Sequence, residues 1–317
     1  MRRGHPGSWD PQGAIVPLAT RLRRFLDPEA VSQLDSMELI ARLVVEGFIA
    51  GLHRSPFHGF SVEFSEYRPY NPGDSVSRVD WKVFAKTDRH YIKLFEEETN
   101  LRGTLLLDGS RSMDFAGREG GITKFRYASM LAAGLAYLLV RQQDAVGLIT
   151  FDEQIRQVLP ARSVRRHLYD LLTAIERNEP GGLTDVGATL HRAAERVKRR
   201  GLVILLSDLL DEPERVLAGL KHFRHRGHEV LVFHGLDPLE RDLDLRREVR
   251  LEDLETGEKL RTQPWFIRKE VGERVDAWIR QLESECRAHR IDYVPLTTDM
   301  PFDVALRRVL DRRARLR

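Results

Sequence analysis

Three loops of the sequence carry oxygen-bearing side chains next to apolar segments. Asp108, Ser110 and Ser112 follow the run TLLL, Asp208 ends the run LVILLSD, and Thr184 lies between a glycine pair and an amphipathic segment. Glycines let a backbone approach a bound ion closely. Two carboxylates and three hydroxyls are hard donors, which suit Mg²⁺ or Mn²⁺ in an octahedral array. We therefore predict a divalent-metal site at these five residues. With few direct anionic ligands, the ion would keep positive charge and could accept a carboxylate from outside.

Asp108 has two other interpretations. It could cap a turn or helix after a strand, or it could be a covalent nucleophile, as in aspartyl-phosphate enzymes. A phosphatase resembling haloacid dehalogenases would need a second Asp two residues later, where Ser110 stands. A phosphate-binding loop is also conceivable, but the sequence has neither Gly-x-Gly-x-x-Gly nor a Walker lysine. Thr184 and Asp208, on two other loops, favour the metal ligand.

The elements that must position these residues follow from short, continuous apolar runs. They are TLLLD, VGLITF, LVILLSD, EVLVFH and DYVPL, separated by segments long enough for helices. Runs that do not alternate must be covered on both faces, which is typical of a parallel sheet between helices. The prediction is a doubly wound α/β fold of Rossmann type with a mainly parallel sheet. In such folds ligands bind beyond the carboxyl ends of the strands, where the strand order reverses.

The remaining elements set the predicted domain organisation. Apolar periodicity predicts helices over 37–52, 125–139, 168–175, 186–199, 213–224, 265–288 and 302–313. A Thr256-Gly257 turn predicts a hairpin near 249–262, and alternation predicts two strands around a short helix between residues 60 and 95. We expect an N-terminal tail over 1–34, a helix and β extension over 35–103, and the main α/β domain over 104–317.

Composition excludes several classes of function. The 51 basic and 48 acidic residues are interspersed and give a net charge of +3, which argues against a nucleic-acid binder. A single cysteine, Cys286, excludes a disulfide framework and fits a reducing compartment. The N-terminus lacks the apolar core of a signal peptide. The most apolar segment, LIARLVVEGFIAGL, contains Arg42 and Glu46 and is too short to span a bilayer. We expect a cytoplasmic protein without membrane insertion.

Two further groups of residues receive structural interpretations. His222, His225 and His228 lie close together in HFRHRGHEV, and we interpret the first two as solvated basic residues at a helix C-terminus. Trp81 stands in a charged block, where it would cover the edge of a short helix. We do not predict a metal site at these histidines. An exposed Trp81 between charges would instead suit a protein contact.

The five residues of the predicted metal site also resemble a known motif. Asp108-Gly-Ser110-Arg-Ser112, followed by Thr184 and Asp208, is similar to the metal-ion-dependent adhesion site of von Willebrand factor A-type domains. The resemblance implies that the three hydroxyls coordinate the ion and that the two acids act directly or through water. It also implies that a Glu or Asp of a partner protein fills the sixth position.

A second resemblance covers most of the chain. The segment from VEGFIAGLHRS to KLFEEETN, with LETGEKL and IDYVPLTTDMPF, resembles the bacterial domain-of-unknown-function family fifty-eight. Members have a von Willebrand factor A-like domain and are often encoded beside a MoxR-type AAA ATPase. Many carry N-terminal transmembrane helices, which we do not find in this sequence.

Three functions remain open at this point. The resemblances favour a non-enzymatic, metal-binding interaction module that acts as an adaptor of a MoxR-type ATPase. The alternatives are a metal-assisted phosphoester hydrolase and a scaffold with a vestigial metal site. The hydrolase lacks a convincing general base, because no His closely follows any of the three loops.

Overall fold

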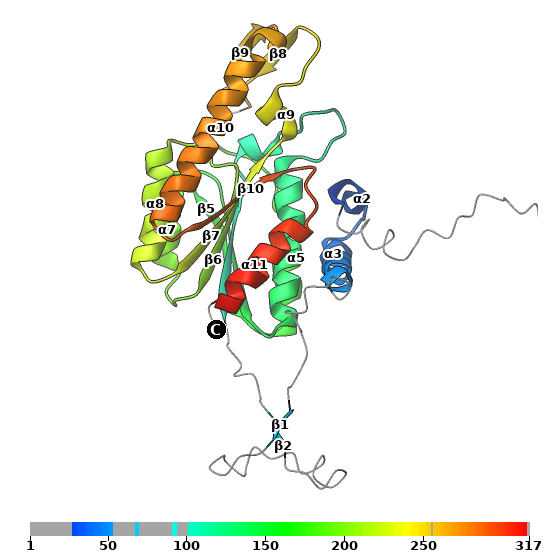
Figure 1. Cartoon of the computed structure of the whole chain (residues 1–317), viewed down its shortest axis with the longest axis vertical. Coiled ribbons are helices and arrows are strands. Elements are labelled where there is room, and N and C mark those ends of the chain that lie inside the picture. The colour runs from blue at the N-terminus through cyan, green and yellow to red at the C-terminus, as the bar shows by residue number, and fades with distance from the viewer. Residues whose placement is uncertain (1–26, 53–66, 70–90, 94–100, 255, 316–317) are drawn as a thin grey trace, which may run out of the picture.

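The computed structural model describes residues 27–52, 67–69, 91–93, 101–254 and 256–315 (Figure 1). A six-stranded sheet forms the centre, with strand order β10-β7-β6-β3-β4-β5. All neighbours are parallel except β4 and β5, which are antiparallel. The strands are β3 (Arg102–Asp108), β4 (Ala145–Phe151), β5 (Ile155–Arg162), β6 (Leu202–Ser207), β7 (Glu229–Leu236) and β10 (Asp292–Thr297).

Helices cover both faces of this sheet (Figure 1). One face is covered by α5 (Lys124–Arg141), α6 (Arg165–Glu176) and α11 (Asp303–Arg315), and α3 (Met37–Leu52) packs on the outer side of α5 and α6. The other face packs against α7 (Val186–Arg196), α8 (Pro213–His225) and α10 (Pro264–Ala288). Along β3, Leu105 and Leu107 join the first cluster and Leu106 joins the second. Burial on both faces explains why the strand sequences do not alternate, and it confirms the predicted mixed α/β architecture.

The N-terminal helix shares the main hydrophobic core. Ile40, Val44 and Phe48 of α3 are buried and belong to the same cluster as the apolar side of α5. A short helix that the sequence did not predict, α2 (Pro28–Ser32), precedes it. Asp27 caps α2 by accepting a hydrogen bond from the backbone N–H of Glu29, and Pro28 starts the helix.

The principal differences from the predicted elements concern β5 and short helical segments. β5 was not predicted, because its exposed and half-buried residues do not alternate regularly and register shifts interrupt its pairing with β4. The segment η2 (Arg111–Asp114) and the short helix α9 (Pro238–Asp242) were also missed. The predicted hairpin is present as β8 (Val249–Glu252) and β9 (Lys259–Thr262). Its β-strands and the first turns of α10 project beyond the sheet (Figure 1).

The remaining observations concern the upstream segment, the histidines and the cysteine. β1 (Tyr67–Pro69) pairs with β2 (Tyr91–Lys93), but the strand expected at residues 60–64 and the Trp81 block lie outside the described residues. His225 is exposed, whereas His228 is buried and its Nε2 donates to the carbonyl of Val197 at the end of α7. Cys286 is buried.

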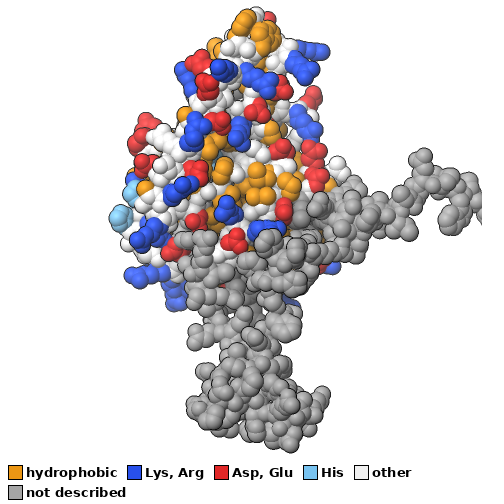
Figure 2. Space-filling view, in the orientation of Figure 1, with side chains coloured by type: hydrophobic (Ala, Val, Ile, Leu, Met, Phe, Trp, Pro, Cys, Tyr) orange, Lys and Arg blue, Asp and Glu red, His pale blue; other side chains and the backbone are white. Residues whose placement is uncertain are grey.

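Charged side chains of both signs are interspersed over the visible face (Figure 2). In the part of the chain that the structure describes, no helix combines the length and low polarity that a membrane span requires.

Candidate functional site

The site begins where β3 and β6 end side by side. These strands are parallel neighbours, with Leu107 of β3 opposite Leu206 of β6. The chain continues from β3 to β4 on one side, whereas β6 lies on the other, so the strand order reverses between them. Such a reversal leaves a crevice at the carboxyl edge of a sheet. Asp108 and Asp208 stand at this edge, both fully buried.

The loop that carries Thr184 is held against the loop after β3 by backbone hydrogen bonds. The N–H of Gly181 donates to the carbonyl of Gly109 at 2.8 Å, and the N–H of Arg111 donates to the carbonyl of Gly182 at 3.2 Å. Gly182 has φ of +76°, and a Cβ there would lie 2.5 Å from a carboxylate oxygen of Asp152. Only glycine fits this close approach. The two loops are thereby brought together across a long stretch of sequence.

Three hydroxyls come into contact as a result. Ser110 Oγ lies 3.1 Å from Ser112 Oγ, and Ser112 Oγ lies 3.4 Å from Thr184 Oγ1. Ser110 and Ser112 are buried, and Thr184 is half-buried. The predicted hydroxyl residues therefore do converge.

Both carboxylates are already hydrogen-bonded within the protein. Asp108 Oδ1 accepts the backbone N–H of Ser110 at 2.9 Å, and its Oδ2 accepts the hydroxyl of Ser207 at 2.5 Å. Burial, and next the negative charge of Asp208, raise the pKa of Asp108 from 3.8 to about 7, although these hydrogen bonds oppose the rise. A proton or a cation at this place would relieve the repulsion between the two acids.

The residue after Asp208 has an unusual backbone conformation. Leu209 is buried and has φ of +54°, which is uncommon for a residue other than glycine. Its N–H donates to Ser207 Oγ at 2.9 Å, and its carbonyl accepts the N–H of Asp211 at 2.7 Å. This tight turn places Leu210 and Asp211 at the open side of the site. Strained conformations of this kind are found most often at functional sites.

Lys124 and Glu240 complete the site, and the sequence did not indicate either of them. Lys124, the first residue of α5, is 1% exposed; its Nζ donates to Asp208 Oδ2 at 2.8 Å and to Glu240 Oε1 at 2.6 Å. Burial would lower the pKa of Lys124, but the two carboxylates outweigh it and the pKa is raised. A lysine at a helix N-terminus opposes the helix dipole. That unfavourable placement is the one feature of the sequence that could have drawn attention to Lys124.

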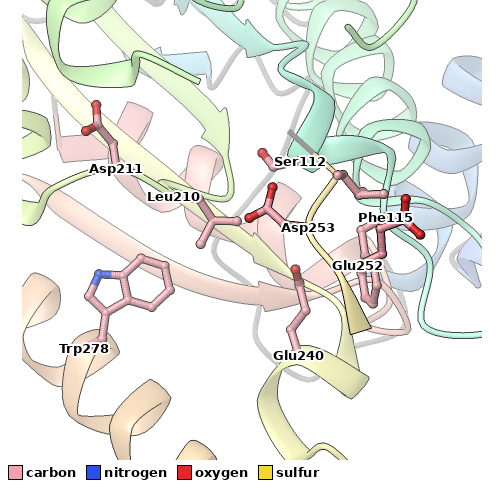
Figure 3. Close-up of a pocket in the computed structure, with 9 residues that line it drawn as sticks. Ser112, Phe115, Leu210, Asp211, Glu240, Glu252, Asp253 and Trp278 are labelled. Carbon is pink, nitrogen blue, oxygen red and sulfur yellow. The ribbon is translucent and has the colours of Figure 1, made fainter. Parts of the chain in front are cut away.

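A cavity of about 630 Å³ opens beside Ser112 (Figure 3). Glu240 enters it from α9, Trp278 from α10, and Glu252 and Asp253 from the end of β8. The full lining comprises Ser112, Phe115, Leu210, Asp211, Glu240, Glu252, Asp253, Leu254 and Trp278. The cavity thus joins the hydroxyl cluster to the projecting hairpin, with apolar side chains and a carboxylate rim.

The donor set fits a small hard cation of the kind predicted. Metal–oxygen distances of about 2.1 Å in an octahedron place neighbouring ligand oxygens about 3 Å apart, which is close to the two hydroxyl contacts. Among the described residues, no three His, Cys, Asp or Glu side chains form a group that could hold a metal. Any metal at this edge would therefore depend on the serine and threonine hydroxyls.

The fold defines a mixed α/β protein with a mostly parallel sheet flanked by helices and a polar cluster at its carboxyl edge. The chain belongs to the family described as protein of unknown function DUF58, whose model matches residues 66–277.

The chain is similar to bacterial proteins of known sequence and to two solved structures. Uncharacterized proteins of Mycobacterium bovis and Mycobacterium tuberculosis are 29% identical over 248 residues, which is 77% of each chain. An aerotolerance-related membrane protein from Bacteroides fragilis is 18% identical with a TM-score of 0.42, covering 67% of this chain and 97% of that one. BatB from Bacteroides thetaiotaomicron, a conserved hypothetical protein, is 17% identical with a TM-score of 0.42, covering 68% and 99%.

Proposed function

We propose that this chain is a divalent-metal-binding interaction module with a von Willebrand factor A-like domain. Mg²⁺ or Mn²⁺ would be held by Asp108, Ser110, Ser112, Thr184 and Asp208, as in a metal-ion-dependent adhesion site. The ion would recruit an acidic side chain of a protein partner. The observation that carries the proposal is the contact of three hydroxyls beside two buried carboxylates.

The hydrogen bonds of the two acids assign different roles to the ligands. Every oxygen of Asp108 and Asp208 already accepts a hydrogen bond from the protein. Each still has a second lone pair, which suits contact with the ion through water. The hydroxyl oxygens of Ser110, Ser112 and Thr184 would instead bind the ion directly. An ion held mainly by neutral oxygens stays a strong Lewis acid, and it binds an incoming carboxylate well.

The cavity beside Ser112 supports a protein segment as the ligand. Leu210, Leu254 and Trp278 provide apolar contacts for neighbouring side chains of that segment. We propose a non-enzymatic role in the cytoplasm. The adaptor role with a MoxR-type AAA ATPase rests on the family resemblance.

The metal-assisted hydrolase is less well supported. A covalent mechanism is disfavoured, because Asp108 is fully buried with both oxygens engaged, which is unfavourable for a nucleophile. No histidine lines the described cavity, so a general base would have to be one of its carboxylates.

Isothermal titration calorimetry with Mg²⁺ and Mn²⁺ tests the metal site. We expect Ser110→Ala to weaken binding at least about tenfold, because it removes a ligand oxygen. Ser129→Ala is the matched control, since this buried α5 hydroxyl has no hydrogen-bond partner in the described structure. A wild type that binds neither ion, even with an acidic peptide present, refutes the proposal.

The partner is tested by capture of a purified MoxR-type ATPase in Mg²⁺ and in EDTA. Capture in Mg²⁺ alone, lost in Ser110→Ala and retained in Ser129→Ala, is the expected result. Equal capture under all conditions contradicts the metal-dependent adaptor. Phosphoester hydrolysis that disappears in Asp208→Ala would support the hydrolase instead.

A further inference from the structure

Lys124 is a buried cation that the proposed metal site does not use. Its charge is enclosed at the start of α5, where both burial and the helix dipole are unfavourable to it. The ring of Phe115 lies 5.8 Å from Nζ and closes one side. Such a placement is stable only because Asp208 and Glu240 bind the ammonium group.

The arrangement fixes which side of Asp208 an ion can approach. Oδ2 of Asp208 accepts the ammonium group at 2.8 Å, whereas Oδ1 accepts the backbone N–H of Leu210 at 3.3 Å. An ion bound directly to Oδ2 would lie within a few ångströms of Nζ. Two cations at that separation repel strongly in a buried site. Lys124 would therefore exclude a divalent ion from Oδ2 of Asp208.

Glu240 holds Lys124 in this position. Its Oε1 accepts the ammonium group at 2.6 Å, and its Oε2 accepts the backbone N–H of Asp237 at 2.8 Å. The second bond belongs to the capping box of α9, so the carboxylate is fixed to a helix. The charges of Lys124 and Glu240 cancel, and the charges of Asp108 and Asp208 remain to balance a divalent ion.

We propose that Lys124 is a positioning residue that keeps Asp208 from binding the ion through Oδ2, and so preserves the ion's affinity for a partner's carboxylate. This inference rests on the metal-binding function proposed above. A direct carboxylate ligand would lower the effective charge of the ion and strengthen its retention. Lys124 thus lowers the affinity of the site for the ion and raises the affinity of the bound ion for a partner's carboxylate.

The experiment uses the full chain, Mn²⁺ and a short peptide with one Glu between neutral residues; a Gln peptide is the control. Calorimetry and Mn²⁺ electron paramagnetic resonance measure both affinities. In Lys124→Met we expect Mn²⁺ to bind about tenfold tighter or more, and the Glu peptide to bind more weakly. In Glu240→Gln we expect the opposite changes, because the lysine charge is then shared with Asp208 alone.

The double variant Lys124→Met/Glu240→Gln separates position from charge, since it keeps the wild-type net charge. The proposal expects it to bind Mn²⁺ more tightly and the Glu peptide more weakly than wild type. Wild-type affinities for both ligands would show that only charge matters and would overturn the proposal. A purely structural role predicts weaker binding of both ligands in every variant.

Three outcomes separate the failure of this proposal from the failure of the proposed metal function. If the Met variants do not fold, Glu240→Gln alone tests the proposal, and unchanged or reversed affinities overturn it. If the wild type binds no Mn²⁺, the proposed metal function itself fails. If the wild type binds Mn²⁺ and the Glu peptide but the double variant behaves like wild type, only the role of Lys124 fails.

Discussion

Replacing Asp108 with Asn should stabilise the metal-free protein at pH 8. The carboxylate is fully buried, and the charge of Asp208 adds to the cost of ionising it. Asn keeps the two hydrogen bonds of the side chain, because its Oδ1 can accept the N–H of Ser110 and its Nδ2 can donate to Ser207 Oγ. The substitution therefore removes mainly the charge.

The magnitude follows from the pKa of Asp108, which is raised from 3.8 to about 7. Between these values the folded state binds more protons than the unfolded state, so stability falls as the pH rises. The contribution of protonated Asp108 to the free energy of unfolding is fully present below pH 3.8 and is lost as the pH rises past 7. At about 1.4 kcal/mol for each pH unit, the loss is up to about 4 kcal/mol. Relaxation around the carboxylate would reduce it.

Urea unfolding in EDTA at several values between pH 4 and pH 8 measures this effect. The free energy of unfolding of Asp108→Asn, minus that of wild type, should grow with pH over this range. Added Mg²⁺ should raise the stability of the wild type more than that of the variant, because the ion compensates a charge that the variant lacks. A difference that is independent of pH, or a variant less stable at pH 8, refutes this account of the buried acids.

Two other predictions concern the helices and the sheet. Gly219→Ala should lower the free energy of unfolding, measured in urea, by about 1–3 kcal/mol. The new Cβ would lie 2.6 Å from Leu190 Cβ and 3.1 Å from the carbonyl oxygen of Gly187. A more stable variant, as helix propensity alone predicts, would contradict this packing. Burial lowers the pKa of His234 from 6.5 to about 4. The contribution of neutral His234 to the free energy of unfolding is therefore fully present above pH 6.5, and up to about 3 kcal/mol is lost as the pH falls toward 4. His234→Gln should show a smaller loss than wild type over that window in the same assay, and equal losses would show that His234 does not titrate there.

The sheet was largely predictable from the sequence, because burial on both faces forces continuous apolar runs. β5 escaped prediction because it lies at the edge of the sheet, is partly exposed and pairs irregularly with β4. The short helix α9 escaped because a helix of five residues contains too few apolar positions to show a period.

Only part of the candidate site could be predicted from the sequence, because two of its residues come from distant helices. Asp108, Ser110 and Ser112 are neighbours in sequence, and strand topology placed Asp208 and Thr184 on loops at the same edge. Lys124 and Glu240 reach the site through the packing of α5 and the capping of α9. Nothing in their local sequence specifies those contacts, which arise only when distant helices pack together.

The energetics of the site favour the proposed metal-binding module over a scaffold with a vestigial site. Two repelling carboxylates buried at the end of a sheet lower the stability of the metal-free protein. A protein that needed only a scaffold would be more stable with a neutral side chain at Asp108, which could make the same hydrogen bonds. Lys124 forms buried ion pairs with Asp208 and Glu240, but it compensates only part of the negative charge of the three carboxylates at the site. The remaining charge matches that of one divalent ion, so the arrangement is costly without a cation and balanced with one.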